Sequence, residues 1–214
     1  MSVAAFVLGT ALAAAPAEPG LLVVPPEGNG TGPDAAWVGE AVSDLLPRAL
    51  AQAGLSAVSR EDRLRAQQAL EIPRVPLTRA TAIRVAEAAG AARLVTGTCT
   101  RDARGLTREL RMLDVERASW STPFVVAGPL TGLADLVQTV AWDVALAGPG
   151  APTATRDEFF ARRLGVPYEA VEAYGQGLLA REPAAQQRQL ERALTLAPGF
   201  QEARLALGRL QIET

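Results

Sequence analysis

The sequence predicts an α/β protein with a mixed sheet, in which parallel strands precede an antiparallel meander, flanked by helices and followed by a C-terminal α-helical hairpin. In the first half, short apolar runs typical of strands alternate with segments whose apolar residues recur at helical spacing. Segments with alternating apolar and polar residues, typical of strands, follow, and near the end the apolar residues recur only at helical spacing. The 214 residues, 49% of them hydrophobic, suffice for one good core plus an appendage. We expect a signal segment, an α/β domain, a linker and a set of helices at residues 1–17, 20–147, 148–155 and 156–214.

The N-terminal residues 2–17 form an uncharged run of small and apolar residues that ends in Ala15-Pro16-Ala17. This pattern is typical of a secretory signal peptide, and because Pro16 disfavours cleavage after Ala15, we expect cleavage after Ala17. The run ends without a cysteine for lipid attachment and is too short for a comfortable membrane-spanning helix. The predicted location is the periplasm or the medium, without stable membrane insertion. The missing basic start leaves a cytoplasmic location open.

The first elements of the α/β part follow in order. Residues 21–24 are a short apolar strand, and residues 25–33 are a loop rich in glycine and proline. A helix is expected over 34–54, with Asp34 as its N-cap and a kink or one lost backbone bond at Pro47. Residues 55–58 are expected to form the second strand.

Capping signals and alternation place the remaining elements of the α/β part. Ser59 and Thr78 are the expected N-caps of two helices, which end near Leu70 and at Gly90. The lone Cys99 lies in an apolar strand and is expected to be a small core residue. Strands are predicted at 93–100, 106–115 and 120–127, a helix at 131–146 and a linker at 148–152.

The composition argues against catalysis. There is no histidine or lysine and one cysteine, which excludes histidine-based nucleophile systems, histidine zinc sites and lysine Schiff bases. The paired carboxylates Glu61-Asp62 and Asp157-Glu158 lie near expected helix starts, where acidic residues favour the helix dipole. We therefore expect no enzyme activity, cofactor or metal. The net charge of −2 provides no long-range attraction for nucleic acid or an anionic membrane.

The C-terminal part is helical throughout. Val171, Tyr174 and Leu178 recur at helical period, and Glu182-Pro183 separates them from the next helix. In that second helix the apolar residues fall at i, i+3, i+4 and i+7, and Pro198-Gly199 ends it. A third helix carries Ala203, Leu207 and Leu210, in a segment where Gly208 would let a neighbouring helix come close.

The order of residues in this hairpin resembles a tetratricopeptide repeat. Leu190, Ala193 and Pro198 match its second helix, and Leu207-Gly208 match the following first helix, so the match covers about one and a half repeats. An ordinary helical hairpin packed on the preceding domain is the alternative. The resemblance implies a surface that binds a protein partner, with Leu190, Ala193, Pro198 and Gly208 as structural residues. The candidate partner-binding residues on the concave side are Gln176, Glu202 and Arg209.

The α/β part also resembles a family. The run Leu-Val-Val-Pro25, a long helix containing Asp44-Leu-Leu, the segment 89–97 and the meander are similar to the TolB-like amino-terminal domain, over roughly residues 21–147. Related domains occur in FlgO-type and CsgG-type envelope proteins. The resemblance implies a non-catalytic module built for contacts in the bacterial cell envelope, where it often precedes tetratricopeptide repeats.

Two other functions stay open at this point. Gly28, Gly30 and Gly32 follow a strand and precede a helix, where a weak nucleotide-binding loop would lie, although Pro33 replaces the last glycine of the dinucleotide pattern. A cytoplasmic regulatory or sensor module of a signalling system is the other alternative.

Overall fold

The structure, a computed structural model, describes residues 20–29, 34–73, 75–102, 105–148 and 152–213. The predicted signal segment and its cleavage site lie outside these residues. The strands are β1 Gly20–Val23, β2 Glu27–Asn29, β3 Ala91–Asp102, β4 Gly105–Asp114, β5 Ser119–Trp120 and β6 Phe124–Gly128. The helices are α1 Asp34–Gln52, α2 Arg60–Ala69, α3 Arg79–Ala88, the 3-10 turn η1 Leu130–Gly132, α4 Leu133–Ala147, α5 Arg156–Ala161, α6 Tyr168–Leu179, α7 Pro183–Leu196 and α8 Gln201–Glu213.

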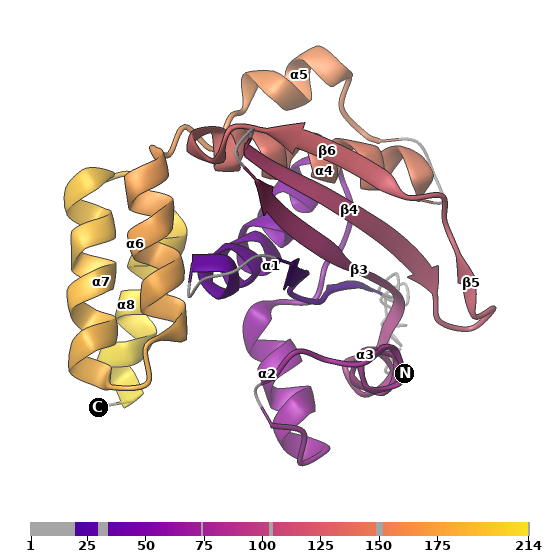
Figure 1. Cartoon of the computed structure of the whole chain (residues 1–214), viewed down its shortest axis with the longest axis horizontal. Helices are drawn as coiled ribbons and strands as arrows, with labels where there is room; N and C mark the ends of the chain where they lie inside the picture. Colours follow the sequence, from indigo (N-terminus) through magenta and orange to yellow (C-terminus); the bar gives the residue numbers. More distant parts are fainter. Residues whose placement is uncertain (1–19, 30–33, 74, 103–104, 149–151, 214) are drawn as a thin grey trace, which may run out of the picture.

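The described strands form one mixed sheet, as the sequence predicts. β1 and β2 both pair parallel with β3, β3 pairs antiparallel with β4, and β4 pairs antiparallel with β5 and β6. β1 sends Leu21 and Val23 into the larger hydrophobic cluster and Leu22 into the smaller one, because successive strand residues point to opposite faces. Helices α1 and α4 cover the first face, and α2 and α3 cover the second (Figure 1).

Three predictions about strands need correction. Residues 55–58 are not a strand: Ala57 forms one parallel bridge with Leu21, and Val58 N–H donates to the Leu21 carbonyl. The expected strand 120–127 is interrupted because Pro123 has no N–H to donate, and the Ser121 hydroxyl replaces a ladder acceptor for Met112 N–H at 3.0 Å. The expected loop 25–33 contains β2, which pairs Gly28 with Cys99.

Local signals placed the helices well. The Ser59 hydroxyl accepts from Asp62 N–H at 3.1 Å, and the Thr78 hydroxyl accepts from Thr81 N–H at 3.3 Å. Pro47 lies inside α1 without ending it. Thr155 and Glu158 form a reciprocal capping box at α5, so the Asp157-Glu158 pair does mark a helix start. Side-chain caps act within one turn, and for this reason the sequence is sufficient to find them.

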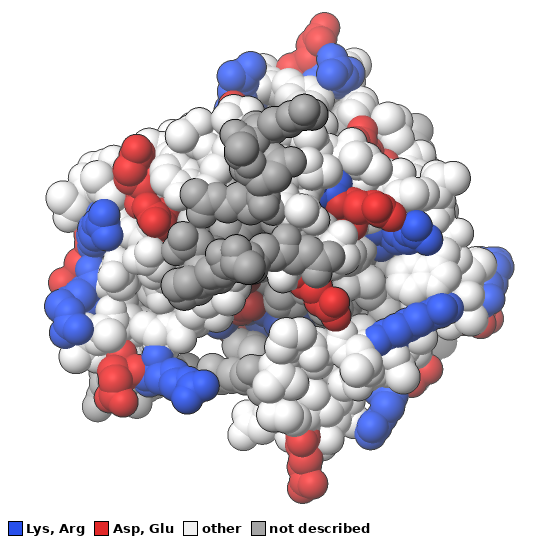
Figure 2. All heavy atoms as spheres, viewed as in Figure 1, with Lys and Arg blue, Asp and Glu red and all other residues white. Residues whose placement is uncertain are grey.

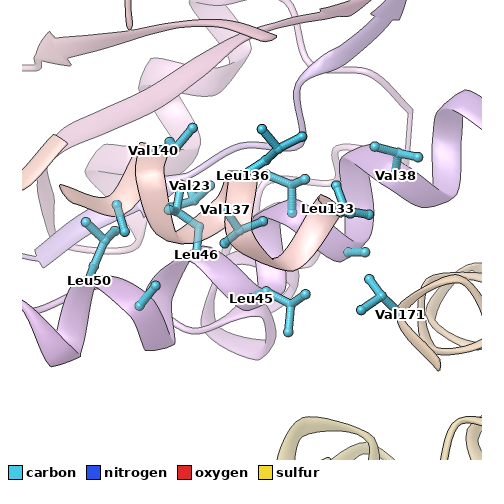
Figure 3. Packing of buried hydrophobic residues seen from close by; sticks show 14 of the residues in the cluster. Val23, Val38, Leu45, Leu46, Leu50, Leu133, Leu136, Val137, Val140 and Val171 are labelled. Carbon is cyan, nitrogen blue, oxygen red and sulfur yellow. The ribbon is translucent and has the colours of Figure 1, made fainter. Parts of the chain in front are cut away.

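The hydrophobic core is continuous from the α/β part into the C-terminal helices. Val171 and Tyr174 of α6 belong to the same cluster as Val38 and Leu45 of α1 (Figure 3). Residues Leu130–Ala147 are apolar enough over 18 residues to cross a membrane, but half of this segment is buried. The contacts of α4 in the core account for its apolar sequence. The predicted boundary between the two parts therefore falls within a single packed body.

Close helix packing depends on glycines other than the predicted one. A Cβ at Gly208 would meet no atom within 4 Å, so the expected close approach there is wrong for the described structure. At Gly175, a Cβ would lie 2.8 Å from the carbonyl oxygen of Trp37 and 3.2 Å from the Cβ of Ala41, which brings α6 directly onto α1. At Gly177 the nearest atom is a Leu190 methyl at 3.1 Å, which brings α6 onto α7.

Two residues on the buried face of β3 and β4 complete the core. Cys99 is a buried free thiol, as predicted, and burial raises its pKa. Arg108, which pairs with Cys99 in the ladder, is also buried, and burial lowers the pKa of its guanidinium. The alternation in β4 predicts that residue 108 points inward with Leu110, and the arginine follows this pattern despite its charge.

Candidate binding groove

Ion pairs between α1 and the start of α2 fix the position of α2. The buried Glu40 accepts hydrogen bonds from Arg60 Nε at 2.6 Å and from Arg63 Nη2 at 2.9 Å. Arg60 also donates to the Leu178 carbonyl of α6 at 3.1 Å. Because the Ser59 cap sets the first turn of α2, both arginines reach the same carboxylate from one helix. A single acidic residue thus links α2 to α1, and Arg60 extends the link to α6.

The protonation of Glu40 reflects this environment. Burial by itself raises the pKa of Glu40, but the charges of Arg63 and Arg60 and their hydrogen bonds together hold the pKa below its usual value. A carboxyl group with a lowered pKa favours folding above its unfolded pKa, and this contribution is lost as the pH falls through the folded pKa. At neutral pH the cluster is therefore charged and paired.

Asp44 shows the opposite balance. The Tyr174 hydroxyl of α6 donates to the Asp44 carboxylate of α1. Burial raises the pKa of Asp44, and the hydrogen bond from Tyr174 and the charge of Arg60 only partly oppose this effect. Burial and the neighbouring carboxylate also raise the pKa of the Tyr174 hydroxyl. The pair joins α1 to α6 through a hydrogen bond in which the tyrosine stays protonated.

Replacement of Asp44 by asparagine should change the pH dependence of stability. A raised pKa means that the folded protein binds the proton more tightly, so wild-type stability falls as the pH rises from 3.8, the ordinary value for this group, through the raised pKa. Asparagine keeps an acceptor for Tyr174 and does not titrate. Urea unfolding across this pH range should show the free-energy difference moving in favour of Asp44→Asn as the pH rises. A difference that stays constant with pH would contradict the raised pKa.

The structure places the predicted partner-binding residues against the rest of the chain. Glu202 of α8 accepts two hydrogen bonds from Arg48 of α1, at 2.5 and 2.6 Å. Arg209 of α8 pairs with Glu61 of α2. Gln176 donates to Glu172 on its own helix at 3.4 Å. Glu202 and Arg209 thus take part in ion pairs that hold α8 against α1 and α2, and a role of the three residues in binding a partner stays a prediction.

Glu61 likewise has a role that the sequence did not indicate. Its position at a helix start predicts only a favourable interaction with the helix dipole. In the structure its carboxylate reaches α8, 148 residues further along the chain. The pairing is visible only after the helices have packed, and a local capping rule cannot find it.

A groove of about 820 Å³ lies between α2 and the C-terminal helices. Figure 2 shows the surface hollowed between these two parts, with basic and acidic side chains around the hollow. The walls combine apolar, amide and charged side chains from both parts: Arg60, Glu61, Leu64, Arg65, Gln67, Gln68, Glu71, Ile72 and Pro73 face Tyr174, Leu178, Ala180, Gln186, Ala206, Arg209 and Leu210. Such a mixture in a concave site is able to bind a ligand through both apolar and polar contacts.

Sequence reasoning missed most residues of this groove. Arg60, Leu64, Gln67 and Glu71 recur at helical spacing along α2 and its end, and all four line the groove. The signal was the strongly polar character of α2, which leaves few residues for the core. Of the predicted binding residues, the groove includes Arg209.

The glycine loop of the nucleotide hypothesis is only partly described. Gly28 lies in β2 and pairs with β3, so it is part of the sheet rather than of a loop. Gly30 and Gly32 lie outside the described residues. In the described part of the chain, no cluster of three or more potential ligand side chains could hold a metal ion.

The architecture defines the class of the protein: an α/β unit with a mixed sheet, covered by helices on both faces and extended by C-terminal helices. No family model matches the sequence, and no curated protein matches it. Several solved structures are similar over part of the chain, among them the following three. The C-terminal domain of LpoB from Salmonella enterica is 21% identical, with 52% of this chain and 83% of that chain covered and a TM-score of 0.45.

TolB from Acinetobacter baumannii is 17% identical, with 63% of this chain covered and a TM-score of 0.43; this chain spans 29% of that TolB. The LpoB C-terminal domain from Escherichia coli is 25% identical, with 50% of this chain and 82% of that chain covered and a TM-score of 0.42. The tetratricopeptide character of α6 to α8 is not confirmed by these similarities and stays a prediction.

Proposed function

We propose that this chain is a non-catalytic binding module of the bacterial cell envelope that holds a protein partner in the groove between α2 and the C-terminal helices. The observation that carries the proposal is the construction of the groove. Its two walls come from different parts of the chain, and two contacts link them: a hydrogen bond from Arg60 to the Leu178 carbonyl of α6, and an ion pair between Glu61 and Arg209 of α8. A preformed site of this kind binds without a large ordering cost.

The envelope location rests on sequence. It is supported by the uncharged apolar run at residues 2–17 and by the TolB-like pattern of the α/β part. The role of a protein partner, rather than a substrate, is supported by the composition, since the chain has no histidine or lysine for acid–base or covalent chemistry.

A substitution that fills the groove should release the partner. Gln68 is exposed and lines the groove, so Gln68→Trp adds a large side chain there without disturbing the core. Gln187→Trp, at an exposed position of α7, is the matched control. We expect cross-linking in native cells, followed by mass spectrometry of the purified bait, to recover the partner with the wild type and with Gln187→Trp but not with Gln68→Trp.

The same experiment tests the location. A bait whose first peptide begins at Glu18, with envelope proteins attached, is the expected result. An intact Met1 with cytoplasmic signalling proteins attached would favour the regulatory alternative. If both tryptophan variants capture the same proteins as the wild type, the groove is not the binding site.

A further inference from the structure

We propose that the occupant of the groove is a polypeptide segment in which an arginine or lysine side chain is flanked by apolar side chains; this inference rests on the proposed function. The charges, the buried acceptor and the apolar side chains that line the groove support this assignment.

The basic side chains of the groove are already paired. Arg60 pairs with Glu40, Arg65 with Asp62 and Arg209 with Glu61. Among the charged lining residues that the structure describes, Glu71 has no ion pair. Glu71 therefore offers an occupant an unpaired negative charge, and a cationic group on the occupant would complement it.

Glu71 occupies a position where glycine would be easier to accommodate. Its φ of 55° lies in the left-handed region, which residues other than glycine and asparagine seldom adopt. The turn is held by hydrogen bonds from Glu71 N–H to the Gln68 carbonyl at 3.0 Å and from Ile72 N–H to the Gln67 carbonyl at 2.8 Å. The backbone alone would favour glycine at this position. A role for the carboxylate in binding would explain why a glutamate is present instead.

A second lining residue lacks a partner of its own. Gln67 is 3% exposed, and its Oε1 accepts no hydrogen bond. A buried acceptor without a donor is unfavourable, because it has lost water without gaining a replacement. The Gln67 side chain lines the groove, and a rotation that turns this oxygen toward the occupant would let an N–H group of the occupant satisfy it. Gln67 lies in the last turn of α2 and Glu71 in the turn that follows, and both line the groove, so one ligand can reach both.

The apolar side chains define the rest of the occupant. Leu64 and Ile72 on one wall and Leu178 and Leu210 on the other line the same groove. They favour apolar groups on both sides of the cation. A peptide provides all three features at once, since its backbone carries an N–H at nearly every residue and its side chains supply charge and apolar surface in sequence.

Selection from random peptides tests the inference directly. Peptides displayed on phage are selected on the full chain and counter-selected on Gln68→Trp. The expected enriched peptides contain arginine or lysine between apolar residues. Glu71→Gln should weaken their binding by about twofold to fivefold, the effect of removing an exposed ion pair, whereas Glu87→Gln on the exposed face of α3 should leave it unchanged.

A second substitution separates binding from folding. Glu71→Gly should raise the melting temperature, since glycine adopts a positive φ without strain. At the same time it should weaken the binding of the enriched peptides, as Glu71→Gln does. Enriched peptides that depend on the groove but lack basic residues would overturn this inference and leave the proposed function standing. The absence of any peptide that depends on the groove would overturn both. Competition by free arginine amide as strong as that of the peptide would assign the groove to a small amine instead.

Discussion

Replacement of Glu40 by alanine should lower the free energy of unfolding by about 3–5 kcal/mol, the cost of breaking a buried ion pair by removal of one partner. Arg63, whose side chain is 5% exposed, would keep its charge and lose the carboxylate that compensates it. Arg60 would lose the same partner. Urea unfolding at neutral pH, followed by far-UV circular dichroism, measures the change.

Acid provides an internal check on this result. Glu40 has a lowered pKa, so its contribution is complete above 4.5, the ordinary value for this group, and declines as the pH falls below that value. The difference between wild type and Glu40→Ala should therefore shrink in acid. Glu87→Ala, an exposed change on α3, should alter stability by less than about 0.5 kcal/mol. If Glu40→Ala lowers the free energy of unfolding by no more than Glu87→Ala does, the ion pairs of Glu40 with Arg60 and Arg63 do not stabilise the fold.

Gly175→Ala should destabilise the protein by about 1–3 kcal/mol, the usual range for an added methyl group in a well-packed interior. The new methyl would lie 2.8 Å from both the carbonyl oxygen and the ring of Trp37, and the backbone oxygen cannot rotate away. Helix α6 would have to move off α1. Since Tyr174 is the adjacent residue, the hydrogen bond to Asp44 should weaken with it.

Gly208→Ala is the matched control for Gly175→Ala. Both glycines lie inside helices, but the space around Gly208 is open, so alanine there should gain about 0.5–1 kcal/mol from helix propensity. Thermal unfolding of the two variants should move the melting temperature in opposite directions. Equal shifts in the same direction would mean that the contact between α6 and α1 is looser than the structure shows.

Much of the fold could be predicted because it depends on neighbours in the sequence. Ser59 and Thr78 mark helix starts through bonds that close within one turn. The register of β3 and β4 pairs Asp102 with Gly105, three residues apart, so their alternation and their register are both local features. Residues 55–58 were predicted wrongly because an apolar run is compatible with a strand, and only the neighbouring β1 decides whether a ladder extends beyond one bridge.

The candidate site could be predicted only in part. Arg209 was selected from its place in a repeat pattern, and it does line the groove. Arg209 pairs with Glu61, and Glu202 pairs with Arg48. The two residues of each pair are about 150 residues apart in the sequence, so each contact depends on how α8 packs. The repeat pattern assigned no role to Gly175, although its lack of a side chain is what allows α6 to contact α1.

The sequence by itself determined the class of the fold, most helix starts, the central hairpin and a composition without the usual catalytic side chains. These features follow from interactions within a few residues and from the residue types available. Only the tertiary structure decided that one core extends into the C-terminal helices, which glycines are required, and that α2 and α8 enclose a groove with an unpaired carboxylate at Glu71. Contacts between distant segments depend on the shape and charge of both segments, so the sequence of one segment does not indicate which other segment it will contact.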